Sequence, residues 1–311
     1  MHTSAGVDYG FLRQLVFGLS QNVLDPSRDY LFDTRLTHLL RNQGMTHLEE
    51  LVQHIKQRRN PTLERAIAEA MTINETSFFR DLRPFELLRA ELLPKLIEAR
   101  RPVRGLRFWS AACSTGQEAY SLAMLMNEHF PMLVGWNIRI EGTDICGEVV
   151  RRAQAGSYHR IEINRGLPAR ALVRYFDRVG EDWTVKPEIR RMCNFRQCNL
   201  CQPPLPFNGV PFNASPHNGS SLNPSPRNSS DDRFDVIFLR NVMLYFAQET
   251  RKILLANIHR LLAPDGILFL GASEQPADPS IWTPVLAGGT CHFRPRRPSR
   301  KSREQGSGNR D

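Results

Sequence analysis

Residues 108–124, which read FWSAACSTGQEAYSLAM, constrain the fold more strongly than any other part of the chain. An apolar strand over residues 106–109 runs into a turn of small residues, and an amphipathic helix is expected to begin near Gln117. Small residues let a ligand approach the backbone closely, and the free N–H groups at a helix start favour anionic or polar groups. Many α/β folds open a nucleotide-like pocket in this way at the carboxyl end of their first strand.

The glycine content of this turn narrows the class of ligand. Gly116 stands alone, whereas the dinucleotide fingerprint GxGxxG requires three glycines. No Gly-Lys-Ser/Thr sequence follows, so the turn is not a phosphate-binding P-loop either. The remaining common occupant of such a pocket is S-adenosylmethionine, which is therefore the expected cofactor.

From about residue 104 onward, expected strands alternate with expected helices. The continuous apolar run Val236–Leu239 suits a parallel strand that is covered on both faces. This alternation predicts an α/β fold with a doubly wound, mostly parallel sheet. The expected strands are LRFWS, IRIEGTD, NFRQCNL, FDVIFLR and ILFLGAS.

Other regions flank or interrupt this sheet. Residues 1–95 carry apolar positions at helical spacing and form the expected small, all-helical N-terminal domain. The expected cofactor-binding domain covers residues 96–293 and contains short strand-like pieces at about 152–195, which predict an inserted β-subdomain. Residues 202–233 are rich in Pro, Asn, Ser and Gly, and we interpret them as a flexible insertion.

The basic charge of the chain is concentrated at its C-terminal end. The formal net charge is +9, and residues 292–311 hold seven Arg or Lys against two acidic residues. We therefore interpret residues 294–311 as a disordered, solvated basic tail, and we do not expect a nucleic-acid partner. No apolar run reaches the ~20 residues of a membrane helix, and the N-terminus lacks a signal-peptide core. The expected localisation is cytoplasmic.

The six cysteines are interpreted as thiols in that compartment. Cys193, Cys198 and Cys201 follow a C-x4-C-x2-C spacing that resembles part of a metal site. Neither a fourth cysteine nor a histidine lies near them in the sequence, so we expect no metal.

Two carboxylates lie where a bound nucleoside would be recognised. Asp144 ends the second expected strand, where an acidic residue accepts hydrogen bonds from ribose hydroxyls in nucleoside-binding α/β folds. An N-cap of the following helix is the alternative role for Asp144. Glu118 lies in the first turn of the helix after the small-residue turn, where the helix dipole stabilises it. It is also suited to hold the cationic end of a methionine moiety.

Two polar clusters complete the candidate site. Arg240 and Asn241 fall at the carboxyl end of the strand in FDVIFLRNVMLYF, and Tyr245 follows within one turn. The second cluster is NETSFFRD, residues 74–81, which offers an amide, a hydroxyl and a guanidinium at helical spacing.

Six segments, in order and at sensible spacing, resemble the CheR family of S-adenosylmethionine-dependent methyltransferases. Members of that family esterify glutamate side chains of bacterial chemoreceptors. The resemblance runs from about residue 10 to residue 293, and it implies a helical N-terminal domain, an α/β catalytic domain and an inserted β-subdomain. The segments are NETSFFRD, WSAACSTGQEAYSLAM, GTDI followed by ARALVRYF, CNL, FDVIFLRNVMLYF and APDGILFLGASE.

The resemblance also implies which residues bind the cofactor. Glu118 would bind its methionine end, Asp144 would hold the ribose, and Asn199 with Leu200 would flank the adenine. The residues of NETSFFRD would reach the cofactor from the linker, and Arg240 with Asn241 would line the pocket near the sulfonium. The implied cofactor-binding set is Asn74, Thr76, Arg80, Glu118, Asp144, Asn199, Leu200, Arg240 and Asn241.

The resemblance implies that Tyr245 stands close to the transferred methyl group. Arg80 is the second candidate catalytic residue, because its guanidinium could position the acceptor carboxylate; Arg240 is an alternative for that role. The family's receptor-docking helix corresponds to the region of Arg35, His38 and Arg41, which are spaced three residues apart and would form one stripe. A solvated helix face is an equally good interpretation of that stripe.

The chain departs from the family at residues 177–185, which are shorter than the Gly-rich hairpin with which some members grip a receptor's C-terminal peptide. We therefore expect no tether to such a peptide. One alternative function is a nucleic-acid methyltransferase, suggested by the basic tail and by the Gln-Pro-Pro-Leu sequence at residues 202–205. The other is a catalytically silent adaptor or sensor that binds receptors.

Overall fold

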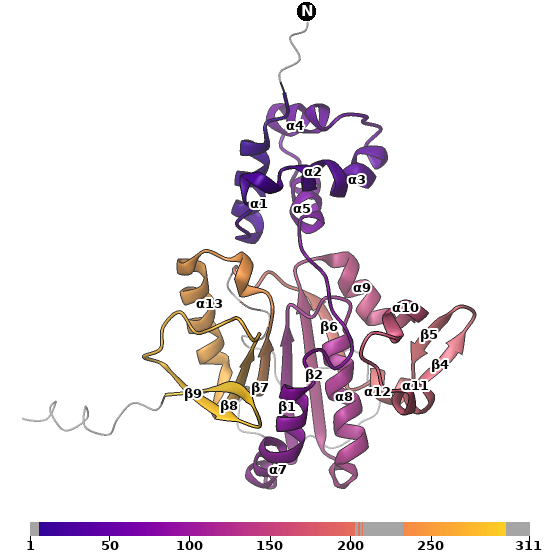
Figure 1. Ribbon diagram of the computed structural model, residues 1–311, viewed down its shortest axis with the longest axis vertical. Coiled ribbons are helices and arrows are strands. Elements are labelled where there is room, and N and C mark those ends of the chain that lie inside the picture. Colours follow the sequence, from indigo (N-terminus) through magenta and orange to yellow (C-terminus); the bar gives the residue numbers. More distant parts are fainter. Residues whose placement is uncertain (1–5, 203–204, 206, 208–232, 297–311) are drawn as a thin grey trace, which may run out of the picture.

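A helical N-terminal region stands on an α/β body, and one linker segment leads from the first to the second (Figure 1). The structure is a computed structural model that describes residues 6–202, 205, 207 and 233–296. Most of the expected insertion at 202–233 and of the expected basic tail at 294–311 lies outside these residues. None of the helices in the described part of the chain has the length and apolar composition needed to cross a membrane.

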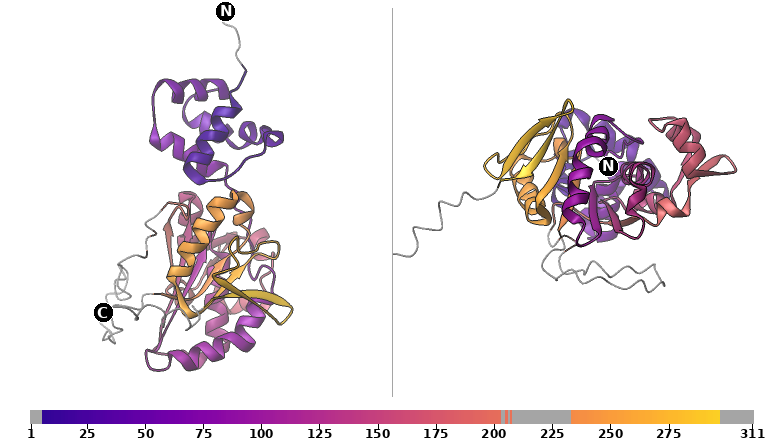
Figure 2. Two further views of the ribbon diagram at one scale, coloured as in Figure 1. Left: turned by 90° about the vertical axis from the view of Figure 1, so that its left-hand side faces the viewer. Right: turned by 90° about the horizontal axis from the view of Figure 1, so that it is seen from below.

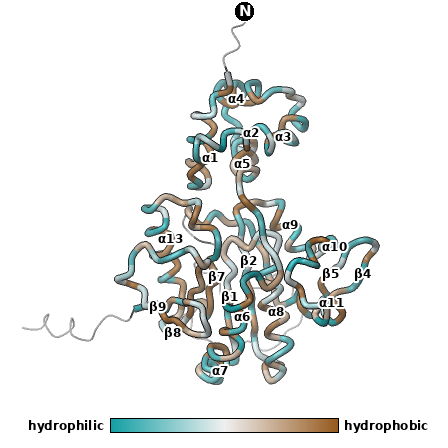
Figure 3. The backbone as a smooth tube through the Cα atoms, viewed as in Figure 1, coloured by the Kyte–Doolittle hydropathy of each residue, from teal (hydrophilic) through white to brown (hydrophobic). Residues whose placement is uncertain are grey.

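The N-terminal region contains helices α1 (Tyr9–Ser20), α2 (Tyr30–Arg35), α3 (Thr37–Asn42), α4 (Leu48–Gln57) and α5 (Pro61–Ala70). Apolar and polar residues are interspersed along these helices (Figure 3), and apolar residues spaced three or four apart give a helix one face that can be buried. The buried faces share a core of their own. Its members are Leu12, Val16, Phe32, Leu36, Leu40, Leu48, Leu51, Val52, Ile55, Leu63, Ile67 and Met71.

The body is built on a seven-stranded sheet with the order β6-β2-β1-β7-β8-β10-β9. Five strands run parallel, and β10 pairs antiparallel with β8 on one side and with β9 on the other. This topology confirms the predicted doubly wound, mostly parallel sheet, although the hairpin was not predicted. The strands are β1 (Gly105–Ala111), β2 (Asn137–Asp144), β6 (Cys193–Gln197), β7 (Phe234–Leu239), β8 (Leu262–Leu270), β9 (Trp282–Ala287) and β10 (Thr290–Pro295).

Alternate residues of the central strands face two separate apolar clusters, as expected of a doubly wound sheet. Phe108 and Phe238 face the cluster formed with α8 (Gln117–His129) and α9 (Gly147–Ala155), whereas Trp109 and Leu239 face the cluster formed with α13 (Gln248–Leu261). The sheet is therefore buried on both faces.

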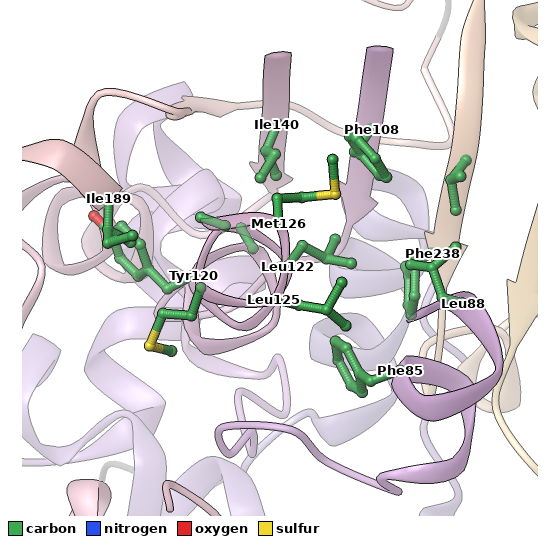
Figure 4. Close-up of a cluster of buried hydrophobic side chains, with 14 of the residues drawn as sticks. Phe85, Leu88, Phe108, Tyr120, Leu122, Leu125, Met126, Ile140, Ile189 and Phe238 are labelled. Carbon is green, nitrogen blue, oxygen red and sulfur yellow. The ribbon is translucent and has the colours of Figure 1, made fainter. Parts of the chain in front are cut away.

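Residues 83–100 belong to this body and not to the N-terminal core. They form α6 (Arg83–Leu87), a π-helical turn (Leu88–Leu92) and α7 (Leu93–Arg100). Phe85 stacks on Phe238 at a centroid distance of 5.5 Å, beside Leu88 and Leu122 (Figure 4). The expected boundary at residue 95 thus falls inside a helix that covers the sheet, because the apolar face of residues 83–100 packs on β1 and β7.

The inserted β-subdomain projects from the side of the body (Figure 2). Its three antiparallel strands, in the order β3-β5-β4, are β3 (Ser157–His159), β5 (Asp182–Val185) and β4 (Phe176–Val179). The expected range of 152–195 was too wide, because Arg152 lies in α9 and residues 193–195 belong to β6 of the main sheet. Short helices α10 (Arg160–Ile163), α11 (Ala169–Tyr175) and α12 (Pro187–Arg190) accompany the three strands.

His292 on β10 is a buried titratable side chain, only 1% exposed. Neither of its ring nitrogens has a hydrogen-bond partner among the described residues. Burial, assisted by the charges of Arg294 and Lys95, lowers the pKa of His292 from 6.5 to about 4. The imidazole is therefore neutral in the folded protein near neutral pH.

Candidate active site

The carboxyl ends of β1, β2 and β7 face the N-terminal region (Figure 1). A pocket opens at these strand ends. Ligands of parallel α/β sheets bind at this edge, because the loops that follow the strands converge there. Every candidate site residue from the sequence lines this one pocket. They are Asn74, Thr76, Arg80, Glu118, Asp144, Asn199, Leu200, Arg240, Asn241 and Tyr245.

The small-residue turn after β1 forms one wall of the pocket. Ala112 and Ser114 have φ values of 59° and 51°, and Gly116 has a φ of 93° at the start of α8. The Tyr158 hydroxyl donates to the Thr115 carbonyl at 2.7 Å and so ties the turn to the β-subdomain. Left-handed φ values at residues other than glycine, such as Ala112 and Ser114, persist only where contacts with the rest of the protein stabilise them. In this turn they direct the backbone toward the pocket.

Asp144, at the end of β2, is only 5% exposed. Its carboxylate accepts hydrogen bonds from the backbone N–H groups of Ser114 at 2.9 Å and Cys146 at 3.0 Å. The alternative role as an N-cap is wrong, because Cys146 occupies the N-cap position of α9. Burial raises the pKa of Asp144, and the backbone N–H donors oppose that shift. The Asp144 carboxylate thus stabilises the turn after β1 through its hydrogen bond to Ser114, and it also lines the pocket.

Arg240 organises the opposite wall, with a side chain that is only 3% exposed. It donates to Glu118 at 3.1 Å, to the Asp81 carboxylate at 2.6 Å and to the Arg80 carbonyl at 3.0 Å. Glu118 also accepts from the Ser110 hydroxyl at 2.7 Å. Both terminal nitrogens of Arg240 are engaged by protein groups, whereas its Nε has no hydrogen-bond partner among the described residues. Arg80 is therefore the better candidate to meet an acceptor.

Residues 74–81, NETSFFRD, are not helical, so the helical spacing expected for their polar side chains is wrong. Phe79 and Asp81 have φ values of 48° and 54°, and Phe78 is buried against Tyr158 with a centroid distance of 5.1 Å. The Asn74 carbonyl accepts from the Ser114 hydroxyl at 2.7 Å. The segment therefore reaches the pocket in an irregular conformation, and the buried Phe78 side chain fixes its position.

The N-terminal region contributes Ser20 and Asn22 to the pocket, and the sequence contained no signal for either. The Asn199 amide donates to the Leu19 carbonyl at 2.7 Å, and its oxygen accepts from the Cys201 N–H at 3.0 Å. Asn199 thus connects the two parts of the protein as well as lining the pocket.

Glu274, in the segment APDGILFLGASE, lies next to the loop that follows β7 and does not itself line the pocket among the described residues. It is 6% exposed and accepts backbone hydrogen bonds from Asn241, Val242 and Met243. Tyr245 follows in a short 3-10 helix (Met243–Tyr245), and its carbonyl accepts from the Val23 N–H at 2.8 Å.

The three candidate docking residues do not form one free stripe. Arg35 ends α2 and donates to the carbonyls of Met71 and Thr72 at 3.1 and 3.0 Å, so it holds the start of the linker. His38 and Arg41 lie on α3 and are exposed. A second groove of about 740 Å³, lined partly by Arg35 and His38, shares four residues with the pocket. The shared residues are Thr72, Asn74, Glu75 and Thr76.

Among the described residues, no three His, Cys, Asp or Glu side chains are grouped so that they could hold a metal ion. Burial raises the pKa of Cys198 to about 11 and that of Cys201 to about 12, so both are thiols near neutral pH. Cys198 lines the pocket as a small, uncharged side chain.

Fold and site together define an α/β protein with a nucleoside-type pocket at the carboxyl ends of parallel strands. Residues 74–210 and 220–287 match the family described as "CheR methyltransferase, SAM binding domain". The chain belongs to the CheR methyltransferase family.

Curated relatives match over most of their length. "Chemotaxis protein methyltransferase 1" of Pseudomonas aeruginosa is 38% identical over 276 residues, which cover 88% of this chain and 91% of that protein. "Chemotaxis protein methyltransferase Cher2" of Pseudomonas putida is 38% identical over 256 residues, covering 81% and 84%. "Chemotaxis protein methyltransferase" of Vibrio parahaemolyticus is 33% identical over 261 residues, covering 81% and 83%.

Proposed function

We propose that this protein transfers the methyl group of S-adenosylmethionine to glutamate side chains of methyl-accepting chemoreceptors, forming methyl esters. The observation that carries the proposal is the convergence of ten candidate residues, from five separate segments of the chain, on one pocket. Membership of the CheR family and the names of the relatives support the cofactor and the chemotaxis setting.

The pocket residues suit each end of such a cofactor. The Asp144 carboxylate has acceptor capacity beyond its two backbone donors, which fits a pair of ribose hydroxyls. Glu118 is held by Ser110 and Arg240 with its charge toward the pocket, which fits the ammonium of a methionine end. Asn199 and Leu200 line the same pocket and would flank the adenine. When bound, S-adenosylmethionine supplies a methyl group on a positively charged sulfur.

The acceptor needs orientation more than activation. A glutamate carboxylate has a pKa near ~4.3 and is already the nucleophile at neutral pH, so no general base is required. Arg80 would orient it, because its side chain lines the pocket and, among the described residues, its guanidinium donates one hydrogen bond, to the Glu75 carbonyl at 2.8 Å. The Tyr245 hydroxyl would fix its second oxygen. Catalysis would then come mainly from holding the reacting groups in line.

The groove that adjoins the pocket is the proposed path for the receptor helix. It begins at the four linker residues that line both the groove and the pocket, and it passes His38 on α3. Arg41 is exposed on the same helix, whereas Arg35 acts as a brace for the linker. The hairpin between β4 and β5 turns within two residues, at Gly180 and Glu181, so we propose no additional tether to a receptor C-terminal peptide.

Incubation with tritiated S-adenosylmethionine and a chemoreceptor membrane fraction tests the proposal. We expect incorporation of label into the receptor band, with release of the label by mild base, as a carboxyl ester requires. Base-stable label on protein or nucleic acid would favour N-methylation. Receptor binding without any label would favour the silent adaptor, and either result would contradict the proposal. S-adenosylhomocysteine binding, measured by calorimetry, provides the control for an intact pocket.

A further inference from the structure

Glu274 is a buried carboxylate that holds four backbone N–H groups at once. It follows β8 and accepts from Asn241 at 2.8 Å, Val242 at 3.0 Å, Met243 at 2.7 Å and Gly271 at 2.7 Å. Each carboxylate oxygen serves two of the donors. Because Glu274 does not line the pocket in the described residues, any effect on chemistry must pass through the loop that it holds.

That loop carries Arg240, Asn241 and Tyr245 from the end of β7 to the pocket. Its conformation is not one that a free chain prefers, since Asn241 has a φ of 58°. The N–H groups of residues 241–243 leave the sheet ladder at this point, and the Glu274 carboxylate takes the place of the missing strand partners.

Close packing at the same junction leaves little freedom for the loop. A Cβ atom added at Gly271 would lie 2.6 Å from the nearer Glu274 oxygen and 3.0 Å from the Asn241 nitrogen. The carboxylate cannot swing away without losing its backbone donors, and the Asn241 nitrogen belongs to the main chain. The residues that follow β7 and β8 are therefore packed closely around the Glu274 carboxylate.

We propose that Glu274 is a positioning residue for methyl transfer, which sets the place of Arg240, Asn241 and Tyr245 through their backbone. The inference rests on the proposed function. It goes beyond that function by assigning control of the turnover rate to a side chain outside the pocket.

The test uses the full-length chain with Glu274→Gln. An amide has one acceptor oxygen, so two of the four N–H groups face an NH2 group whichever way the side chain turns. We expect kcat, divided by the concentration of S-adenosylhomocysteine-binding sites from calorimetry, to fall about tenfold or more, because small misplacements of reacting groups are costly. The KM for the receptor should change less than about threefold.

Asp235→Asn is the matched control. Asp235 is a buried carboxylate at the other end of β7, where it accepts from the Arg107 N–H at 2.8 Å and from Arg100 at 2.6 Å. We expect this variant to lose stability but to keep kcat per binding site. If Glu274→Gln also keeps kcat per binding site, the residue serves folding alone and the inference is wrong.

A Glu274→Gln chain that does not fold would shift the test to Gly271→Ala, whose added methyl group displaces the same carboxylate. A normal kcat per binding site in that variant would equally overturn the inference. Failure of the proposed function itself is distinguishable, because the unmodified protein would then produce no base-labile label on receptors.

Discussion

Replacing Asp144 with asparagine removes a buried charge and leaves the shape of the side chain almost unchanged. Both carboxylate oxygens now accept a backbone N–H, from Ser114 and Cys146. An amide serves only one of these donors, and an unsatisfied buried N–H costs about 1–3 kcal/mol. Removal of the charge offsets part of this cost, because burial raises the pKa of Asp144 and so disfavours its ionised form. We expect the free energy of unfolding to change by less than about 2 kcal/mol.

The effect on ligand affinity should be larger. A hydrogen bond to a charged group contributes about 1.5–3 kcal/mol, and the proposed ribose contact would lose that contribution. With 1.4 kcal/mol per factor of ten, S-adenosylhomocysteine should bind Asp144→Asn about 10- to 150-fold more weakly. Isothermal titration calorimetry measures this change directly.

Glu141→Gln is the matched control for this experiment. Glu141 is a buried carboxylate on the same strand, paired with Asn194 at 2.8 Å and Arg196 at 2.9 Å, and it does not line the pocket. We expect its affinity for S-adenosylhomocysteine to stay within about threefold of the unmodified protein. Equal affinities for Asp144→Asn and the unmodified protein would refute the ribose role.

Three further outcomes are expected. Tyr245→Phe should lower kcat at least about tenfold with unchanged S-adenosylhomocysteine affinity, and an unchanged rate would remove Tyr245 from the mechanism. The pKa of His292 is about 4 in the folded state and 6.5 in the unfolded state. The unfolded state therefore binds a proton first as pH falls, so the stability that the neutral, buried imidazole contributes is present above pH 6.5 and is lost as pH falls toward 4. Denaturation between pH 7 and 4 should therefore show a shallower pH dependence in His292→Leu, by up to about 1.4 kcal/mol per pH unit, and an identical slope would contradict the burial argument. Glu69→Ala should speed proteolysis of the linker. The Glu69 carboxylate on α5 accepts hydrogen bonds from the Gly147 N–H at 3.0 Å and from the Gln197 amide at 2.8 Å, and the variant loses both. Cleavage at the original rate would show that these hydrogen bonds do not hold the N-terminal region to the α/β body.

Much of the site was predictable because local pattern and strand position specify it. Asp144 and Arg240 each end an apolar strand, and parallel strands bring their carboxyl ends to one edge of the sheet. The turn before Gln117 was also predictable, since a run of small residues between an apolar strand and an amphipathic helix is typical of a tight turn.

Other features depended on partners far away in the chain. The role of Arg35 follows from the carbonyls of Met71 and Thr72, which helical spacing does not reveal. Phe85 looked like part of the N-terminal helices, but it stacks on Phe238 and so belongs to the sheet. The sequence does not distinguish Glu274 from other polar residues that follow a strand, because three of its four backbone donors lie about 30 residues away in the chain.

The amino-acid sequence by itself determined the alternation of helices with the parallel strands and the positions of the polar residues that follow these strands. These properties depend on periodicity and turn chemistry, which act over a few neighbouring residues. Tertiary structure alone decided which guanidinium was already engaged, where the helical region ended and which carboxylate held the loop after β7. Hydrogen bonds and apolar contacts of this kind join residues that are distant in sequence, and only folding brings the two partners together.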